Sequence, residues 1–283
     1  MKRHIKNGLL VVFSSFFLSA CSFSFIYNNL DWWSNWYLDD YVTLNQEQQK
    51  VFDISFNELH SWHRKTQLRE YYLQLTALKK QVDSGISQKK IYDHLANIKY
   101  HWFVVREQAK PQLISLIDTL SENQRQQVID EIESVNKERI EDRDELTKEE
   151  WYKETCKQRQ QQFKKWIGKL NQDQKAEVCN FVKELSSTFK HRMDYRIKWH
   201  TDFKQALAID ISKQQYEVMF TELISNPELL KSDEYVKLSD KNSDISVKIF
   251  HYVMNNLTKK QRNRFNNEID DLINDFKALE MND

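Results

Sequence analysis

The sequence is poor in the residues that interrupt helices. Its 283 residues include only three glycines and two prolines. Gly8 lies close to the N-terminus, which leaves Gly85 and Gly168 for the rest of the chain. Sheets, barrels and glycine-rich phosphate loops need more turn-forming residues than this. The scarcity therefore excludes most β and nucleotide-binding folds and favours helices joined by short turns.

The chain also lacks an excess of either charge. Its 42 basic residues balance 42 acidic ones, so the basic surface expected of a nucleic-acid-binding protein is missing. Hydrophobic residues nevertheless make up 40% of the chain and aromatic residues 13%. Disordered chains do not have such an aromatic content. We therefore expect a packed core, in one long domain or two, and no nucleic-acid partner.

No catalytic or cofactor motif is recognisable. The sequence contains no Gly-x-Ser-x-Gly, no phosphate loop and no dinucleotide fingerprint. His60 and His63 are one helical turn apart, but no HExxH or Cys-His cluster accompanies them. Asp39 and Asp40 could pair as acid and base, although we expect them to face an arginine or to cap a helix. We predict no enzyme activity, no cofactor and no metal site. An enzyme would require these four residues in one buried cluster.

The first 20 residues have the three parts of an export signal. Lys2, Arg3 and Lys6 form a basic segment, and residues 9–18 are apolar apart from two serines. Small residues follow, directly before Cys21. The apolar run is shorter than the ~20 residues of a spanning helix. We therefore predict that residues 1–20 are a signal peptide and are removed.

The sequence Leu-Ser-Ala-Cys at 18–21 resembles the bacterial lipobox at all four positions. The resemblance implies that Cys21 is acylated, becomes the first residue of the mature protein and anchors it to a membrane. Ser22 follows instead of aspartate, which by the same resemblance implies the outer membrane, with the body facing the periplasm, rather than the inner membrane. The mature chain would carry 39 basic and 42 acidic residues.

Residues 21–42, next to the predicted lipid, are rich in aromatic side chains. One interpretation is an aromatic belt that seats the protein on the bilayer. We favour a short helix packed into the core, because one helical face combines Leu30, Trp33, Tyr37 and Tyr41. The candidate binding residues are Trp32, Trp33, Trp36, Trp62, His63 and Arg64.

We expect residues 43–283 to form the helical domain, with a possible sub-boundary near 143–147. A helix from Asn45 or Thr43 should end at Asp83-Ser84-Gly85, and Ser87 should begin the next. The apolar stripe of that second helix is formed by Ile91, Leu95, Ile98 and Trp102. Pro111 should kink or break it.

The C-terminal half is predicted to contain the longest helix, from Asn171 to about Ala208. Residues 228–243 are predicted to be a polar loop, followed by a short helix from Asp244 or Ser246. Two basic runs with interspersed aromatics, 157–165 and 190–198, are typical of solvated helical faces. The alternative is that they contact anionic lipid head groups or acidic clients.

One pattern recurs six times: an aliphatic residue, a capping residue, two variable residues, and Gln or Glu. It is the pattern of a capping box, in which the cap oxygen and the later side chain each accept from a backbone amide of the other. We therefore predict six helix starts, each worth about 1 kcal/mol. The copies begin at Leu44, Leu120, Leu146, Leu170, Ile211 and Leu257.

Two family resemblances follow from these motifs. Leu257-Thr258-Lys259-Lys260-Gln261 resembles the Leu-Thr-x-x-Gln signature of periplasmic proteins of the Spy and CpxP type, which are helical chaperones or stress sensors. The stretches Tyr27-x-x-Leu30-Asp31-Trp32 and Trp62-His63-Arg64-x-x-Gln67-Leu68 resemble a family of proteobacterial lipoproteins known only as a domain of unknown function. The second resemblance covers most of the mature chain and implies no activity.

Two cysteines remain after Cys21. The midpoint between Cys156 and Cys179 falls at Gly168, the expected turn of a helical hairpin, so the two residues should face each other. In an oxidising compartment we predict a disulfide between them, provided that their Cα atoms lie within ~7 Å. The alternative is a pair of free buried thiols.

The sequence thus predicts an all-α protein, an elongated antiparallel multi-helix bundle tethered through Cys21. The leading functional hypothesis is a membrane-anchored protein that binds other envelope proteins in a chaperone-like or adaptor-like manner, without catalysis. The alternative is a structural or assembly lipoprotein for one dedicated envelope partner.

Overall fold

The computed structural model describes residues 20–143, 146–208 and 212–281. These residues form eleven α-helices, one short 3-10 helix and no strand, which confirms the predicted all-α, multi-helix fold. The predicted signal peptide up to residue 19 lies outside the described residues, as does the side chain of Cys21. No helix in the described part combines the length and apolar character needed to cross a membrane.

The helices follow one another with short connections. In chain order they are α2 (Ala20–Asn28), α3 (Leu30–Leu38), α4 (Gln46–Asp83), α5 (Gln88–Asp118), α6 (Glu122–Glu141), α7 (Lys148–Ile167), α8 (Gln172–Val182), α9 (Phe189–Ala206), α10 (Lys213–Ser225), the 3-10 helix η1 (Pro227–Leu230), α11 (Asp233–Asn255) and α12 (Lys259–Met281).

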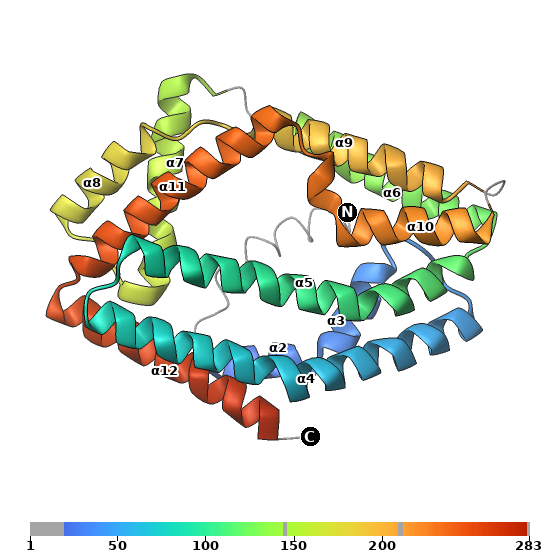
Figure 1. The fold of residues 1–283 in the computed structure, drawn as a ribbon, viewed down its shortest axis with the longest axis horizontal. Coiled ribbons are helices and arrows are strands. Elements are labelled where there is room, and N and C mark those ends of the chain that lie inside the picture. Colours follow the sequence, from blue (N-terminus) through green and yellow to red (C-terminus); the bar gives the residue numbers. More distant parts are fainter. Residues whose placement is uncertain (1–19, 144–145, 209–211, 282–283) are drawn as a thin grey trace.

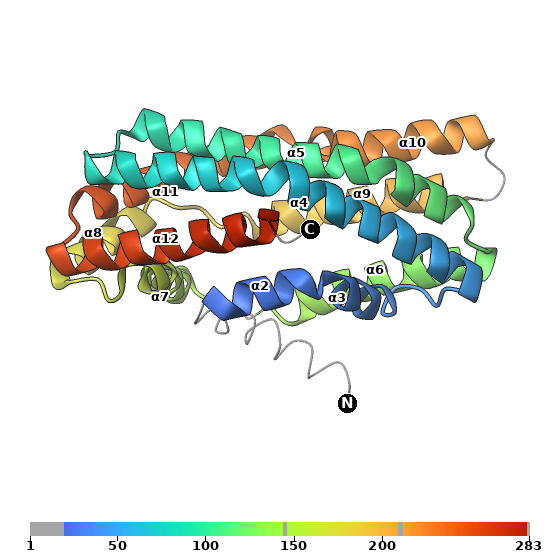
Figure 2. The ribbon, with the colours of Figure 1, turned by 90° about the horizontal axis from the view of Figure 1, so that it is seen from below.

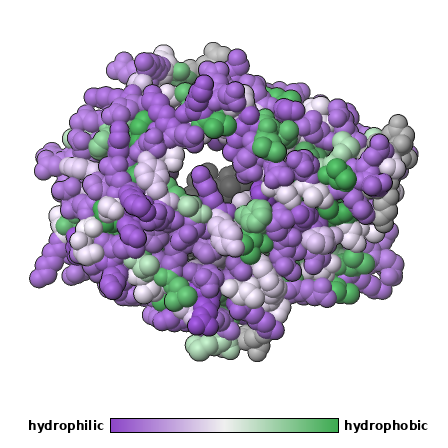
Figure 3. Space-filling model, viewed as in Figure 1, coloured by the Kyte–Doolittle hydropathy of each residue, from purple (hydrophilic) through white to green (hydrophobic). Residues whose placement is uncertain are grey.

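The helices surround a central opening. Figure 1 shows α4 and α5 along one side of a flattened ring, α7 and α8 at one end, and α6, α9 and α10 at the other. Figure 2 shows that the ring is broad and comparatively thin. The opening remains when all side chains are drawn, and hydrophobic residues lie at parts of its rim (Figure 3).

Two hydrophobic cores lie at the two ends of the ring. The first joins α4, α5, α7, α8, α11 and α12, with Val82, Val178 and Val253 completely buried. The second joins α5, α6, α9 and α10 around Phe220. At 1.5 Å per residue, the 31 residues of α5 span about 45 Å, so this helix reaches from one core to the other.

All six predicted capping motifs begin helices. Asn45, Ser121, Thr147, Asn171 and Ser212 each form a complete capping box with the Gln or Glu three residues later. Thr258 forms the same two hydrogen bonds with Gln261, at 2.9 and 3.2 Å. The local pattern therefore placed these helix starts correctly, because capping chemistry depends only on neighbouring residues.

Four of these motifs also bind each other in pairs, which the sequence did not predict. The Nε2 of Gln174 donates to the Oε1 of Gln261 at 3.0 Å, and the Nε2 of Gln261 donates back to the Oε1 of Gln174 at 2.8 Å. Each amide also donates to a backbone carbonyl just before the other motif, Gln174 to Asn256 and Gln261 to Lys169. We call this arrangement a glutamine clasp. It ties the start of α8 to the start of α12.

A second glutamine clasp has the same design. The side chains of Gln48 and Gln124 exchange hydrogen bonds of 3.1 and 2.7 Å. Gln48 also donates to the carbonyl of Thr119, and Gln124 to that of Thr43, both at 2.8 Å. In both clasps the accepting carbonyl belongs to the residue two positions before the capping residue. The second clasp ties the start of α4 to the start of α6.

The prediction of one long helix from Asn171 to Ala208 is wrong. The chain leaves the helix after Val182 and resumes at Phe189. Between them, the backbone N–H of Ser186 donates to the Oδ1 of Asn242 at 3.0 Å, and the Nδ2 of Asn242 donates to the carbonyl of Ser186 at 2.7 Å. A side chain of α11 thus satisfies backbone groups that a helix would otherwise pair.

One further expectation is corrected, and for Pro111 one of two alternatives is excluded. Residues 228–243 are not a polar loop, because Ser232 accepts from the amide of Tyr235 and begins α11, of 23 residues. Their polarity belongs to the exposed face of a helix, and such a face has the same polar composition as a loop. Pro111 lies inside α5 and does not break it. Both ends of α5 are held by cores, at Ile91 and at Ile117.

Candidate functional site

The aromatic N-terminal segment divides into a packed part and an open part. In α2, Tyr27 is buried with Leu68 and Leu279. In α3 no residue is buried, and the side chains of Trp32 and Tyr37 are more than half exposed. The core interpretation therefore holds only in part for α3, where Leu30 packs partly buried against the Tyr27 cluster and the rest of the helix stays open. Its exposure follows from its position, since the main contacts of α3 among the described helices are with α2 and α4.

The three predicted tryptophans of α3 contact one another edge to face. The ring centroids of Trp32 and Trp33 are 4.7 Å apart, and those of Trp33 and Trp36 are 5.9 Å apart. In the same helix, the Nδ2 of Asn35 donates to Asp53 of α4 at 3.1 Å. The half-exposed indoles therefore form a small aromatic surface beside the first turns of α4.

The other predicted binding residues join α2 to the body. His63 shares hydrogen bonds with the hydroxyls of Tyr27 at 2.8 Å and Tyr71 at 3.1 Å. Arg64 donates to Asn28 at 2.8 Å, and its guanidinium lies 5.2 Å from the centre of the Tyr27 ring. Trp62 is half-buried beside His63. The arrangement holds α2 against the body of the protein, so we assign His63 and Arg64 a structural role.

Burial lowers the pKa of the His63 imidazole to about 4, and a smaller contribution comes from the nearby His60. His60 itself has a lowered pKa, mainly from burial and then from the charge of Arg64. Both rings are therefore neutral at neutral pH. No group of three or more metal-ligating side chains occurs among the described residues. Asp39 and Asp40 line a shallow hollow beside Asp130.

The depressed pKa of His63 predicts a pH dependence of stability. As the pH falls below about 6.5, the unfolded chain takes up a proton that the folded protein does not bind until about pH 4. The free energy of unfolding should therefore decrease between these values. Titration of the His63 ring signals by NMR should give a midpoint near pH 4, whereas a midpoint near 6.5 would contradict the buried hydrogen-bonded ring.

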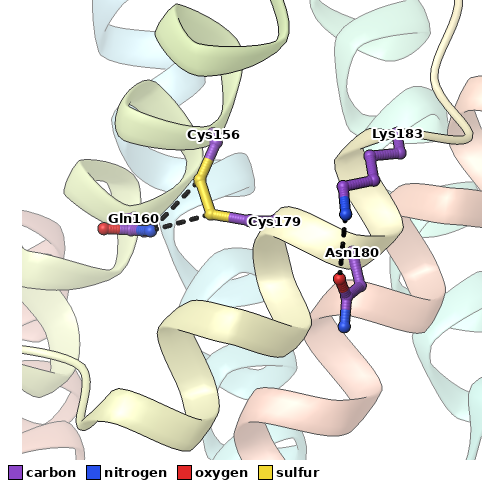
Figure 4. The surroundings of a disulfide bond; sticks show 5 residues. All are labelled: Cys156, Gln160, Cys179, Asn180 and Lys183. Atoms are coloured by element: carbon purple, nitrogen blue, oxygen red, sulfur yellow. Dashed lines mark hydrogen bonds between the residues drawn. A yellow bond between two sulfur atoms is a disulfide. The ribbon is translucent and has the colours of Figure 1, made fainter.

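The predicted disulfide is confirmed. Cys156 of α7 and Cys179 of α8 are bonded, with Cα atoms 5.1 Å apart. Gly168, with a φ of +76°, forms the turn between these helices, as expected from the midpoint. Figure 4 shows the Nε2 of Gln160 directed at both sulfurs, at 3.2 and 3.1 Å. The bond joins α7 to α8 at the end of the ring that contains the first core.

An apolar cavity of about 410 Å³ lies against the first core. Its wall is formed by α4, α5, α7, α11 and α12, and it is almost entirely hydrocarbon and aromatic. Leu95 and Ile98 come from α5, and Phe163 and Trp166 come from α7. Arg159 of α7 is the only arginine in this lining. Cavities of this size and character bind small apolar or amphiphilic molecules.

The apolar stripe of α5 continues from this cavity onto the surface. Ile91 is buried, and Leu95 is half-buried. The next two members, Ile98 and Trp102, are 56% and 63% exposed. The sequence predicted all four as a core-facing stripe. Other helices cover only the first half of this stripe. After that half, α5 leaves the first core and borders the central opening before it reaches the second core (Figure 1).

Sequence reasoning did not identify this cavity. The basic run on α7 that includes Arg159 is typical of a solvated helix face, and nothing in the local sequence indicates that its apolar neighbours line a cavity. The only signal was the interspersed Phe163 and Trp166. A cavity depends on how several helices are spaced, which periodicity within one helix does not determine.

The fold and these surfaces define an all-helical protein with an apolar cavity beside an open ring. The chain belongs to a family of unknown function, DUF6279, whose model matches residues 40–236. The match spans the chain from the end of α3 to the beginning of α11 and includes Trp62, His63 and Arg64. No curated protein and no solved structure matches the chain.

Proposed function

We propose that this protein is a lipoprotein of the outer membrane, anchored through Cys21 with its body in the periplasm, that binds other proteins without catalysing a reaction. The lipobox-like sequence at 18–21 supports the anchor, and Ser22 supports the choice of membrane. Acyl chains on one cysteine are sufficient for stable attachment when two or more are present. The ring would then be held close to the membrane by its α2 end.

The anchor predicts a specific N-terminus. Mass spectrometry of the protein purified from membranes should find an acylated Cys21 as the first residue. Replacement of Cys21 by alanine should abolish the lipid, which leaves the protein either unprocessed or free of the membrane after processing. An intact chain beginning at Met1, without acyl groups, would exclude the anchor.

The observation that carries the binding function is the uncovered half of the α5 stripe. An amphipathic helix normally buries its apolar stripe, and large exposed apolar surfaces mark interaction sites in soluble proteins. Ile98 and Trp102 stand one turn apart on the same face as the apolar cavity, so the exposed surface and the cavity are continuous. An extended apolar segment of a client could cover both.

The capping motifs support a chaperone-like role by resemblance. Leu257-Thr258-x-x-Gln261 follows the signature of the Spy and CpxP type, and here that motif forms one half of a glutamine clasp. An open helical framework with an uncovered apolar face is suited to weak binding of unfolded segments. An adaptor role for folded envelope proteins would use the same face.

The test is suppression of aggregation without ATP. The chain from residue 22, which keeps α3 to α12 and nearly all of α2, is mixed with an aggregating unfolded client while light scattering is followed. We expect suppression near equimolar ratio, and its loss when Ile98 and Trp102 are both replaced by serine. Tyr100→Ser is the matched control, since Tyr100 is 64% exposed on the opposite side of α5.

The outcomes separate the two binding hypotheses. If the folded wild-type protein does not suppress aggregation, the chaperone-like role is wrong, and a dedicated partner should be sought by crosslinking through position 102 in cells. If Tyr100→Ser weakens suppression as much as the double substitution does, the effect is general surface hydrophobicity and the α5 stripe is not the site.

A further inference from the structure

A second hollow, of about 390 Å³, lies on the other side of Arg159 from the apolar cavity. It lies among α7, α9 and the segments leading into them. Its lining contains three arginines, Arg143, Arg159 and Arg192, and the hydroxyls of Ser186, Ser187 and Thr188. None of the described residues that line it is acidic. The hollow is therefore a concentration of positive charge and hydrogen-bond donors.

The three arginines are not neutralised within the described part of the chain. The Arg143 guanidinium donates to Ser187 at 3.4 Å and lies 3.9 Å from the centre of the Phe189 ring. Arg192 lies 5.7 Å from the same ring, and Arg159 donates to Gln162 at 3.2 Å. No described carboxylate forms an ion pair with any of them. Asp144 and Glu145, which follow Arg143, lie outside the described residues.

Arg159 is the member that joins the two hollows, because it lines both. Burial lowers its pKa from the usual arginine value, so its charge is held in a partly desolvated position. A buried guanidinium without a carboxylate is costly unless an anion pairs with it. The N-terminus of α9 adds to the positive potential through the partial charges of its backbone N–H groups. The side chain of Thr188 makes no cap hydrogen bond to these groups.

We propose that the two hollows form one binding site for a single-chain lipid with a phosphate head group. The acyl chain occupies the apolar cavity, and the phosphate lies among Arg143, Arg159 and Arg192. Guanidinium groups recognise phosphate through paired N–H donors, and three of them with three hydroxyls match a phosphate better than a carboxylate with two oxygens. The acyl-chain half of this site adjoins the exposed α5 stripe at Ile98. The lipid proposal does not depend on the protein-binding proposal, because it rests on the arginine hollow, which the α5 stripe does not line.

Binding is measured by titration calorimetry with the chain from residue 22 to 283, at lipid concentrations below micelle formation. The probes are a 1-acyl-glycerol 3-phosphate, the monoacylglycerol with the same chain, the free fatty acid and inorganic phosphate. We expect the acyl-glycerol phosphate to bind about tenfold or more tightly than each of the others. Quenching or a spectral shift of Trp151 and Trp166, which line the two hollows, provides a second readout.

Substitutions assign the two halves of the site. Arg159→Gln and Arg192→Gln should each remove most of the preference for phosphate over the uncharged head group, while binding of the monoacylglycerol is kept. Arg192 is exposed, so its substitution leaves folding intact even if that of Arg159 does not. Arg69→Gln, an exposed arginine on α4 outside both hollows, is the charge-matched control and should change nothing.

Three results would overturn the proposal. The first is equal affinity for the acyl-glycerol phosphate and the monoacylglycerol, which would mean that the arginines do not bind the head group. The second is equal affinity for the fatty acid, which would mean that any anion suffices. The third is binding to anionic phospholipid vesicles but not to the monomeric lipid, which would make the arginines a membrane-contact surface.

Discussion

Replacement of Gln174 by leucine should lower the free energy of unfolding by about 3 kcal/mol. The substitution removes two buried hydrogen bonds of the Gln174 amide nitrogen and leaves the buried Gln261 side chain and the carbonyl of Asn256 without their partner. Each unsatisfied buried polar group costs about 1–3 kcal/mol, and the loss of the cap adds less than about 1 kcal/mol. Denaturant unfolding followed by circular dichroism measures the change.

The matched control is Gln215→Leu, at the same position of another capping motif. Gln215 is exposed and its side-chain oxygen accepts from the backbone N–H of Ser212, so only the cap should be lost, at about 0.5–1 kcal/mol. The double variant Gln174→Leu, Gln261→Leu should be less destabilised than the two single losses added together, because neither side chain is then left unpaired. Additive losses, or equal effects at Gln174 and Gln215, would mean that the clasp contributes nothing beyond capping.

Removal of the Cys156–Cys179 disulfide should have an effect of similar size. The bond spans 23 positions of sequence, for which the loss of chain entropy in the unfolded state corresponds to about 3 kcal/mol. The double variant Cys156→Ala, Cys179→Ala should therefore unfold at a clearly lower denaturant concentration. The first core should lose stability together with the hairpin, since Phe163 and Val178 of α7 and α8 are part of it.

Reduction of the wild-type protein provides the control for this prediction. Reduced wild type and the double alanine variant should unfold at nearly the same denaturant concentration, which separates loss of the bond from loss of the side chains. A change smaller than about 1 kcal/mol would indicate that the turn at Gly168 and the packing of α7 on α8 already restrict the unfolded chain. Oxidised wild type refolded under the same conditions should regain its full stability.

The two predictions differ in what the sequence could show. The disulfide follows from one turn-forming glycine and two cysteines placed symmetrically around it, so a single hairpin is sufficient to foresee it. The clasp joins residues 87 positions apart, Gln174 and Gln261. Nothing in the sequence of either motif indicates which other motif it will contact. The six copies look alike in sequence, yet only the positions of the helix starts in space decide which of them meet.

The candidate sites likewise divide into those that local sequence reveals and those that only the arrangement of distant helices creates. The lipobox-like segment and the aromatic residues near it are local patterns and could be recognised directly. The apolar cavity and the arginine hollow combine residues from helices that are far apart in the chain, such as Arg143, Arg159 and Arg192. The basic runs around Arg159 and Arg192 suggested contact with anionic lipid head groups only as an alternative, because a charged helix face is usually solvated.

The sequence by itself determined the helical class, six helix starts and the pairing of Cys156 with Cys179. These depend on interactions within a turn or within one hairpin, where spacing along the chain sets the geometry. Only the tertiary structure decided the break after Val182, the formation of the two glutamine clasps and the exposure of Ile98 and Trp102. Each of these results from contacts between distant segments, whose free energies outweigh the local preferences of the chain.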